Sequence, residues 1–281
     1  MESEMIFASV VVLYNNTEDE LKNITYYTNQ VDSIYVIDNS LESCLESLKS
    51  ILYDSWEKIN YFHFPENIGL SRALNFGIKK ASKDGCEWAL ILDADSIVSS
   101  PIIKIYESYI KQYDNVAVYA PVHLTDRNRE SVFEGIRDVR WSMTSGCIFN
   151  IPIFNKLGGF NENLFVDGLD IDYCFKAREN GYKIKKCGNA TINHFPAETK
   201  SLFILRKCVF KYGIASPWRY GLRISSTLWI ALRYRSPRMM LAVIEIWLKV
   251  LLLFDNKKAY FEEMKKGLGE GWKMYKAWKK Y

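Results

Sequence analysis

The first 120 residues alternate short apolar runs with longer segments in which apolar residues recur at helical spacing. The short runs have the length and the β-branched content of buried strands. The predicted strands are Ile6–Tyr14, Ser33–Asp38, Ile59–Phe64, Glu87–Asp93 and Val116–Ala120. The predicted helices between them are Thr17–Gln30, Leu41–Tyr53, Ser71–Ser82 and Pro101–Tyr113. Thr17 and Glu20 have the spacing of a capping box. The alternation predicts an α/β fold in which helices cover both faces of a mainly parallel sheet.

Beyond about residue 130 the predicted elements become shorter. Further strands are predicted at Thr144–Asn150, Lys183–Cys187 and Thr191–Phe195, and a helix at Tyr173–Asn180. A short helix at 152–157 ends at Gly158 and Gly159, which suit a helix C-terminus. After residue 200 most of the chain has a helical pattern. We therefore expect two parts, an α/β domain at 1–200 and a helical region at 201–281.

The two parts differ in charge. Residues 1–200 carry 20 Lys+Arg and 28 Asp+Glu, whereas residues 201–281 carry 17 and 5. A basic region rich in Leu and Trp suits an anionic membrane surface better than nucleic acid, so we expect no nucleic-acid partner.

The run Met239–Phe254 is the main membrane candidate within this region. It is too short to span a bilayer and contains Glu245 and Lys249. A helix lying in the interface fits better, with tryptophans as its interfacial residues: Trp218, Trp229, Trp247, Trp272 and Trp278. Helices packed on the α/β domain would have the same periodicity, so that alternative stays open. A dimer formed through these helices is a further hypothesis.

The six cysteines are scattered, without a C-x-x-C pair or zinc-like spacing, which is typical of free thiols in a reducing compartment. Residues 1–4 lead directly into a strand, so no signal peptide is expected. We expect a cytoplasmic protein, peripheral at the inner face of the cell membrane.

Two carboxylates, Asp93 and Asp95, follow the strand Glu87–Asp93 directly. In open α/β sheets, ligands bind beyond the carboxyl ends of the strands. Paired acids at that place suit Mn²⁺ or Mg²⁺, which prefer oxygen ligands and often complete their shells with substrate phosphates. The first strand is followed by Tyr14-Asn15-Asn16, so a glycine-rich dinucleotide fingerprint is absent there, and the chain contains no Walker A sequence.

Several motifs occur together in a fixed order. They are Asp38-Asn39-Ser40, Glu66 to Asn75, Asp93-Ala94-Asp95, Thr144-Ser145-Gly146, Leu157 to Glu162, and Asp170 to Arg178 followed by Gly181-Tyr182. This series resembles the family-2 glycosyltransferases of GT-A fold, particularly the bacterial rhamnosyltransferase-like branch. The resemblance covers roughly residues 5–195.

The resemblance implies a donor site and a metal site. Asp38 would accept the imide N–H of a uracil or thymine ring, and Arg72 would reach the diphosphate. The remaining implied donor residues are Asn67, Gly69, Asn75 and Asp93. Asp95 would bind the metal, with Asp93 contacting ribose or the metal shell and His194 supplying a third ligand. From the residues alone, a turn aspartate, an exposed arginine and a core histidine remain alternatives for Asp38, Arg72 and His194.

Transfer also needs a base for the acceptor hydroxyl. The family places it in an acidic motif at the start of a helix, which here is Leu169-Asp170, so Asp170 is our predicted base. Leu169 stands where many relatives carry Glu, which leaves Asp167 and Asp172 as rival assignments. All three could also be ordinary helix-start acids.

One base and one metal imply a single displacement with inversion. The expected enzyme moves a sugar from a nucleoside-diphosphate donor, with dTDP-rhamnose a candidate, to a saccharide or lipid-linked saccharide in bacterial surface polysaccharide synthesis. A sugar nucleotidyltransferase is one rival, although it would carry a basic, glycine-rich loop after the first strand. A non-catalytic saccharide- or lipid-binding module is the other.

Overall fold

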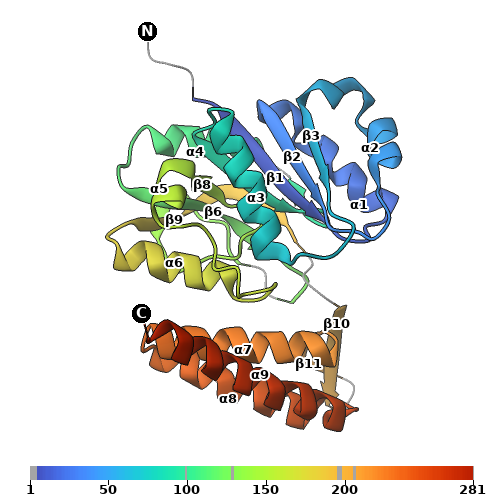
Figure 1. Cartoon of the computed structure of the whole chain (residues 1–281), viewed down its shortest axis with the longest axis vertical. Coiled ribbons are helices and arrows are strands. Elements are labelled where there is room, and N and C mark those ends of the chain that lie inside the picture. Colours follow the sequence, from blue (N-terminus) through green and yellow to red (C-terminus); the bar gives the residue numbers. More distant parts are fainter. Residues whose placement is uncertain (1–4, 99, 128–129, 195–197, 205–206, 281) are drawn as a thin grey trace. The chain divides into compact units, whose positions relative to one another are not determined.

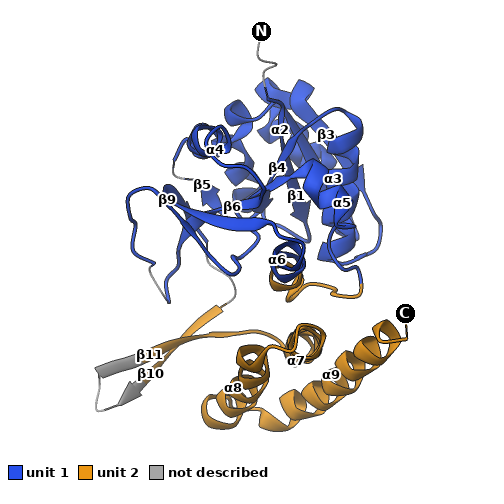
Figure 2. Cartoon of the chain, turned by 90° about the vertical axis from the view of Figure 1, so that its left-hand side faces the viewer, with its two compact units in different colours: residues 1–162, 173–195 blue, residues 163–172, 196–281 orange. Residues whose placement is uncertain are grey.

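The computed structural model describes residues 5–98, 100–127, 130–194, 198–204 and 207–280. It divides into two compact units, residues 1–162 with 173–195, and residues 163–172 with 196–281 (Figure 2). The acidic segment 163–172 therefore groups with the C-terminal unit, although the sequence division placed it in the first domain. Helix α6 (Leu169–Glu179) begins in one unit and continues in the other.

The first unit is built on a nine-stranded mixed sheet flanked by helices (Figure 1). The strand order is β3-β2-β1-β4-β8-β6-β9-β5, and β7 pairs with β9. The strands are β1 (Phe7–Leu13), β2 (Ser33–Asp38), β3 (Ile59–His63), β4 (Trp88–Asp93), β5 (Ile97–Val98), β6 (Val116–Leu124), β7 (Ile136–Asp138), β8 (Ile148–Asn150) and β9 (Lys183–Asn193). The other helices of this unit are α1 (Glu18–Lys22), α2 (Leu45–Ile51), α3 (Leu70–Lys83), α4 (Ile102–Ile110) and α5 (Ile151–Lys156), with 3₁₀ turns at Asn23–Tyr26, Thr28–Gln30 and Tyr53–Lys58.

Alternating residues of β1 face opposite layers, as the period of a strand requires. Val11 packs in one core with residues of α1, α2 and α4. Val10 faces α3, where Gly77 leaves room for its side chain. Because both faces are covered, the central strands are apolar throughout, and β1, β2 and β4 are almost wholly buried.

The second unit contains the hairpin β10 (Glu198–Ile204) and β11 (Lys207–Ile214) and three helices, α7 (Pro217–Arg233), α8 (Pro237–Leu253) and α9 (Lys257–Trp278). Their core includes Tyr220, Ile224 and Met264. Among the described residues, no helix combines the length and apolarity needed to cross a bilayer.

The α/β class, the predicted bounds of β2 and the Thr17–Glu20 capping box are confirmed. The helix predicted at Thr17–Gln30 is interrupted at Asn23, whose amide donates to the carbonyl of Ala94 at 2.8 Å.

The predicted strands Lys183–Cys187 and Thr191–Phe195 are one strand, β9, which passes through Gly188. A side chain at Gly188 would overlap the backbone of Phe133, so this glycine allows a close approach rather than a turn. Phe195 itself lies outside the described residues.

The predicted strand Thr144–Asn150 is regular only in β8, because Gly146 adopts a positive φ of 77°. Beyond residue 200, where a mostly helical pattern was predicted, the first described elements are the paired strands β10 and β11.

Candidate functional site

The chain topology gathers the predicted donor and metal residues of the first unit at one edge of its sheet. Strands β1, β2, β3 and β4 are parallel, so Asp38 and Asp93 stand at the same edge (Figure 1). Strand β8 runs antiparallel to both β4 and β6, and β6 is parallel to β9. The carboxyl end of β9, followed by His194, therefore points to that edge as well.

Asp93, Asp95 and His194 form a three-residue cluster in which one ligand atom of each lies within 4.8 Å of the others. His194 Nε2 is 3.6 Å from Asp93 Oδ2, and His194 Nδ1 is 3.4 Å from Asp95 Oδ1. The imidazole is buried, whereas both aspartates are partly exposed, with 38% of each side chain accessible. The cluster thus opens to solvent on its carboxylate side.

Two serines that the sequence analysis did not single out hold this cluster. Ser145 Oγ accepts the backbone N–H of Asp93 at 3.0 Å and lies 2.8 Å from Ser96 Oγ. Ser96 Oγ is in turn 2.8 Å from His194 Nδ1. Ser145 belongs to the Thr144-Ser145-Gly146 motif, which was the available sequence signal, although the motif did not indicate this role.

The two carboxylates also set the charge state of His194. Burial by itself lowers the pKa of this imidazole, but the adjacent carboxylates of Asp95 and Asp93 outweigh burial and hold the pKa above 6.5. In these surroundings the imidazole of His194 binds either a proton or, instead of the proton, a metal cation.

The residues present fit a divalent cation. Asp95 Oδ1 is buried and has no hydrogen-bond partner in the described part of the chain, which is costly unless a cation or another donor occupies that side. Two carboxylates and one imidazole form a donor set that suits Mn²⁺ and similar divalent ions. Asp93, Asp95 and His194 are the residues that would hold it.

Asp38 is fully buried and organises the loop that follows β2. Its Oδ1 accepts the N–H of Ser40 at 2.9 Å, and its Oδ2 accepts the Tyr61 hydroxyl at 2.5 Å and the N–H of Cys44 at 3.0 Å. Burial would raise the pKa of Asp38, but these hydrogen bonds, led by that of Tyr61, lower the pKa below 3.8. The carboxylate is ionised, and it is an acceptor that shapes the end of β2.

The turn before α3 carries the next predicted residues. Gly69 has φ 87° and donates its N–H to Asn67 Oδ1 at 2.9 Å, so the turn presents backbone close to the start of α3. Arg72, in the first turn of α3, lies 3.6 Å from Glu162, and both side chains are exposed.

Asn75 holds the loop after α5. Its amide donates to the Phe160 carbonyl at 3.0 Å and accepts the Phe160 N–H at 2.8 Å. A side chain at Gly159 would come within 2.7 Å of the same amide. The geometry gives Asn75 a part in positioning the Gly158-Gly159-Phe160 loop.

In the C-terminal unit, the three acids that compete for the role of base have different surroundings. Asp172 is buried and accepts the indole N–H of Trp229 at 3.0 Å and the hydroxyl of Tyr234 at 3.0 Å. Asp167 lies 3.5 Å from both Arg219 and Arg223. Asp170, in the first turn of α6, is partly exposed and accepts the N–H of the adjacent Ile171.

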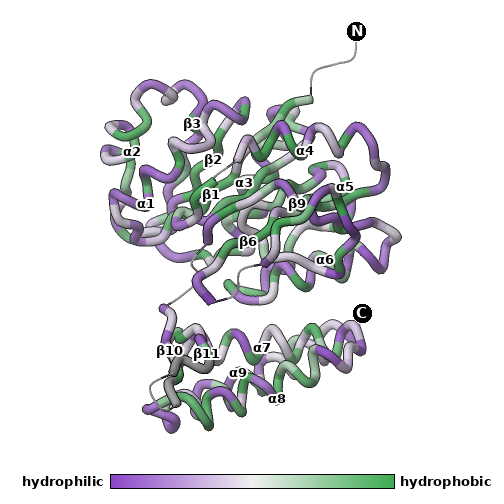
Figure 3. Tube along the Cα trace, turned by 180° about the vertical axis from the view of Figure 1, so that it is seen from behind, coloured by the Kyte–Doolittle hydropathy of each residue, from purple (hydrophilic) through white to green (hydrophobic). Residues whose placement is uncertain are grey.

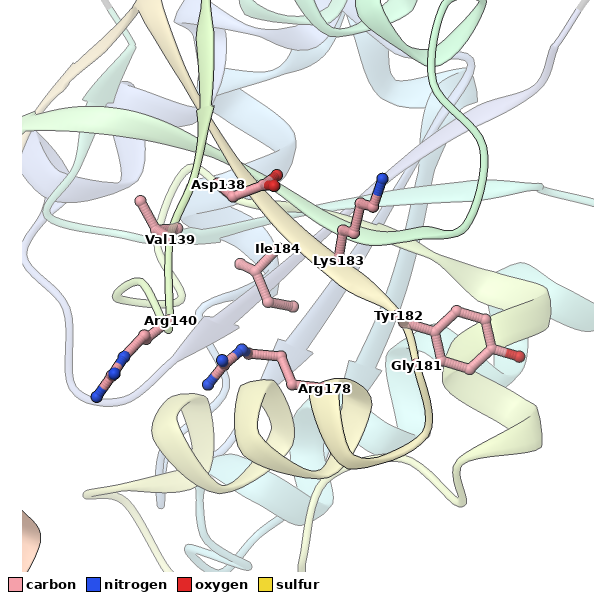
Figure 4. Close-up of a pocket in the computed structure, with 8 residues that line it drawn as sticks. All are labelled: Asp138, Val139, Arg140, Arg178, Gly181, Tyr182, Lys183 and Ile184. Atoms are coloured by element: carbon pink, nitrogen blue, oxygen red, sulfur yellow. The ribbon is translucent and has the colours of Figure 1, made fainter. Parts of the chain in front are cut away.

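The first unit also contains a cavity of about 340 Å³ (Figure 4). Its lining includes Arg178 at the end of α6 and Lys183 at the start of β9. Since His194 follows the opposite end of β9, this cavity does not contain the metal cluster.

The family model for "Glycosyl transferase family 2" matches residues 9–165, more than half of the chain. The chain belongs to this family. The matched range runs from within β1 to beyond β8 and includes Asp38, Asp93 and Asp95, so the family assignment rests on the same part of the chain as most of the candidate site.

Two curated proteins are similar in sequence to this family-2 glycosyltransferase. The dTDP-rhamnosyl transferase RfbF of Shigella flexneri is 26% identical over 284 residues, covering 92% of this chain and 91% of the relative. The low-salt glycan biosynthesis hexosyltransferase Agl10 of Haloferax volcanii is 24% identical over 206 residues, covering 64% of each.

Solved structures share the fold at low sequence identity. GalNAc-T7 with UDP, GalNAc and Mn²⁺ has a TM-score of 0.61 at 13% identity; the match covers 85% of this chain and 52% of that one. S. aureus TarS 1–349 in complex with UDP has a TM-score of 0.55 at 13% identity, covering 94% and 71%. This chain thus spans about half the length of the GalNAc-T7 chain.

Proposed function

We propose that this glycosyltransferase is a metal-dependent, inverting enzyme that uses a nucleoside-diphosphate sugar, with dTDP-rhamnose as the first candidate donor. The observation that carries the proposal is the cluster of Asp93, Asp95 and His194 at the carboxyl edge of the sheet. The similarity to a dTDP-rhamnosyl transferase over nearly the whole chain supports the choice of donor.

The metal cluster has a defined part in this reaction. A bound Mn²⁺ or Mg²⁺ would neutralise charge on the departing nucleoside diphosphate. Asp95 and His194 would hold the ion from the buried side, and Asp93, whose backbone N–H is fixed by Ser145, would complete the protein ligands or contact the ribose.

The donor's base and diphosphate are assigned to the loops after β2 and β3. Asp38 would recognise the imide N–H of a pyrimidine base, either directly through Oδ1 or through the loop whose conformation it sets. Gly69 caps α3 without a side-chain hydrogen bond, so the first N–H groups of α3, together with Arg72, suit a diphosphate. Asn67 holds the turn, and Asn75 acts through the loop that it positions.

Asp170 is the proposed base. Asp172 is buried and accepts hydrogen bonds from Trp229 and Tyr234, and Asp167 is paired with Arg219 and Arg223, whereas Asp170 is partly exposed in the first turn of α6. A carboxylate at Asp170 would take the proton of the acceptor hydroxyl as that oxygen attacks the anomeric carbon and the nucleoside diphosphate leaves. One base and one displacement give inversion.

The deciding experiment is calorimetric titration with dTDP and UDP, each in Mn²⁺, in Mg²⁺ and in EDTA, followed by transfer assays with dTDP-rhamnose. Metal-dependent binding of dTDP and rhamnose transfer with inverted anomeric configuration are expected. Binding that is equal in Mn²⁺ and EDTA would refute the metal role, and UDP preference would refute the choice of donor.

We further propose that the acceptor is a lipid-linked saccharide reached at an anionic membrane surface through α8. Most residues of α8 are apolar, apart from Arg238, Glu245 and Lys249 (Figure 3). Its buried side packs on α7, while five large aliphatic side chains remain exposed by 48–72%: Leu241, Ile244, Leu248, Leu251 and Leu252. These residues recur at intervals of three and four and form one stripe.

Exposed basic residues lie near both ends of the aliphatic stripe of α8. Arg235 and Arg238 precede it, and Lys257 and Lys258 follow it. An aliphatic stripe between basic ends suits a helix lying in a membrane interface, where the stripe contacts acyl chains and the cations contact anionic headgroups. Trp229 is buried, so it cannot serve as one of the interfacial tryptophans predicted from the sequence.

Vesicle flotation tests this surface. Wild-type protein should float with phosphatidylglycerol-containing vesicles and less with pure phosphatidylcholine, and Leu248→Asn with Leu251→Asn should lose flotation. Leu41→Asn, at a 77% exposed leucine of the other unit, is the matched control. Flotation of the double variant at the wild-type level would overturn the assignment of this stripe.

A further inference from the structure

The acidic segment 163–172 lies along α7, with which it forms four successive contacts inside the C-terminal unit. Phe165 packs edge-to-face on Trp218, with ring centroids 5.8 Å apart. Asp167 pairs with Arg219 and Arg223.

The other two contacts lie nearer the end of α7. At Gly168, an added side chain would come within 2.9 Å of Ser226, so the segment's backbone lies directly against the helix. Asp172 receives the hydrogen bonds of Trp229 and Tyr234.

The α7 partners recur at helical intervals, and the segment meets them in chain order. Residues 218, 219, 223, 226 and 229 fall on one side of a helix with 3.6 residues per turn. The chain from Phe165 to Asp172 follows this side in the same direction as α7. The four contacts of segment 163–172 therefore follow α7 in chain order.

Packing and polar contacts both hold the segment, in which Leu164 and Leu169 are buried. A cavity of about 230 Å³ is enclosed by parts of the segment, α7 and α9, and its lining includes Phe165, Leu222 and Met274.

The Asp172 contact is the most specific of the four. Trp229 Nε1 and Tyr234 Oη both lie 3.0 Å from Asp172 Oδ1, and Tyr234 Oη also lies 3.0 Å from the Asp172 carbonyl oxygen. Asp172 is 3% exposed and Trp229 is 6% exposed, so water does not readily replace a lost donor. The two aromatic donors hold both the side chain and the backbone of Asp172 in the first turn of α6.

We propose that α7 positions the catalytic base: Trp229 and Tyr234 fix the first turn of α6 through Asp172 and thereby set the direction of Asp170, two residues earlier. Trp229 and Tyr234 are positioning residues, since they act through Asp172. The inference rests on the proposed role of Asp170.

The expected effect is kinetic. A base must lie within hydrogen-bond reach of the proton that it removes, and a displacement of about 1 Å can cost about 100-fold in rate. Nucleotide binding depends on residues of the first unit, so loss of a donor to Asp172 should lower kcat while leaving the donor KM and the nucleotide Kd unchanged.

The test compares Trp229→Phe, Tyr234→Phe and the double variant with Trp272→Phe. The first two keep an aromatic ring and remove one donor to Asp172. Trp272 is a partly exposed tryptophan of the same unit that packs on Tyr275, so its variant controls for loss of an indole. We expect kcat to fall roughly 10-fold in each single variant and further in the double variant, with KM unchanged and faster hydrogen exchange in residues 163–172. The control should change none of these.

A wild-type kcat in the double variant would overturn the inference, as would a fall in kcat that matches only the loss of folded protein. Asp170→Asn separates the two proposals. If Asp170→Asn is inactive while the double aromatic variant is fully active, Asp170 is the base and α7 does not position it. If Asp170→Asn is active, the assignment of the base fails, and the positioning role fails with it.

Discussion

His194 Nδ1 lies 3.4 Å from Asp95 Oδ1, a buried oxygen without a hydrogen-bond partner in the described residues. This relationship joins the turn after β4 to the end of β9, which are about one hundred residues apart in the chain. Buried polar atoms are normally satisfied, so the arrangement indicates that the oxygen is kept for a ligand.

Replacing Asp95 tests that interpretation. Asp95→Asn keeps the size of the side chain but removes its negative charge, so the gain in dTDP affinity that Mn²⁺ provides should fall at least about tenfold. Calorimetric titration in Mn²⁺ and in EDTA measures this gain. Asp19→Asn, an exposed aspartate on α1, should behave as wild type. Full metal-dependent affinity in Asp95→Asn would exclude Asp95 as a ligand.

The acids of segment 163–172 should separate by function. Asp170→Asn should lower kcat by at least about 100-fold, the usual contribution of a general base, with donor affinity and thermal midpoint near wild type. Asp172→Asn should lower the thermal midpoint as well as kcat, because an amide cannot match the charge-assisted bonds from Trp229 and Tyr234. Transfer assays and thermal melts distinguish the two. A fully active Asp170→Asn would transfer the role to another group.

The sequence predicted those parts of the fold that depend on local pattern. The bounds of β2 followed from an uninterrupted apolar run, and the Asp93–Asp95 pair could be placed at the end of β4 because strand ends are marked by the change to polar residues. His194 could be placed after a strand for the same reason.

The remaining features depend on contacts between distant residues. Asp167, Asp170 and Asp172 are equivalent in the sequence. They differ in the structure because α7, about 55 residues later, places arginines beside Asp167 and an indole N–H beside Asp172. Likewise Asn75 resembled a ligand residue until its amide was seen to bind the backbone of Phe160. Patterns of period 2 or 3.6 carry no information about such partners.

His123 predicts a pH dependence of stability. This imidazole is buried, its Nε2 lies 2.8 Å from the Ser145 carbonyl oxygen, and burial lowers its pKa from 6.5 to about 4. Between pH 6.5 and 4 the unfolded chain binds a proton at this histidine that the folded chain does not, so the free energy of unfolding should fall as the pH is lowered. The loss approaches about 3 kcal/mol at pH 4.

Urea unfolding between pH 7 and 4 measures that slope, with His123→Gln as the comparison. Glutamine does not titrate and can donate to the same carbonyl, so the variant should lose less stability than wild type as the pH falls. At pH 7 the histidine is mostly neutral in both states, so a difference there mainly reports packing and the hydrogen bond to Ser145. An unchanged slope in His123→Gln would show that other groups cause the acid sensitivity.

The crossing of α7 and α9 should depend on one glycine and not on its neighbour. A side chain at Gly267 would overlap the carbonyl oxygen of Gly221 on α7, whereas one at Gly269 would meet no atom within 4 Å. Both glycines lie inside α9, so replacement by alanine gives each the same gain in helix propensity, about 1 kcal/mol. Gly269→Ala should therefore be neutral or stabilising, while Gly267→Ala should destabilise the unit by roughly 1–3 kcal/mol because backbone must move. Thermal unfolding of the pair gives the difference, and equal midpoints would show that the helices do not approach this closely.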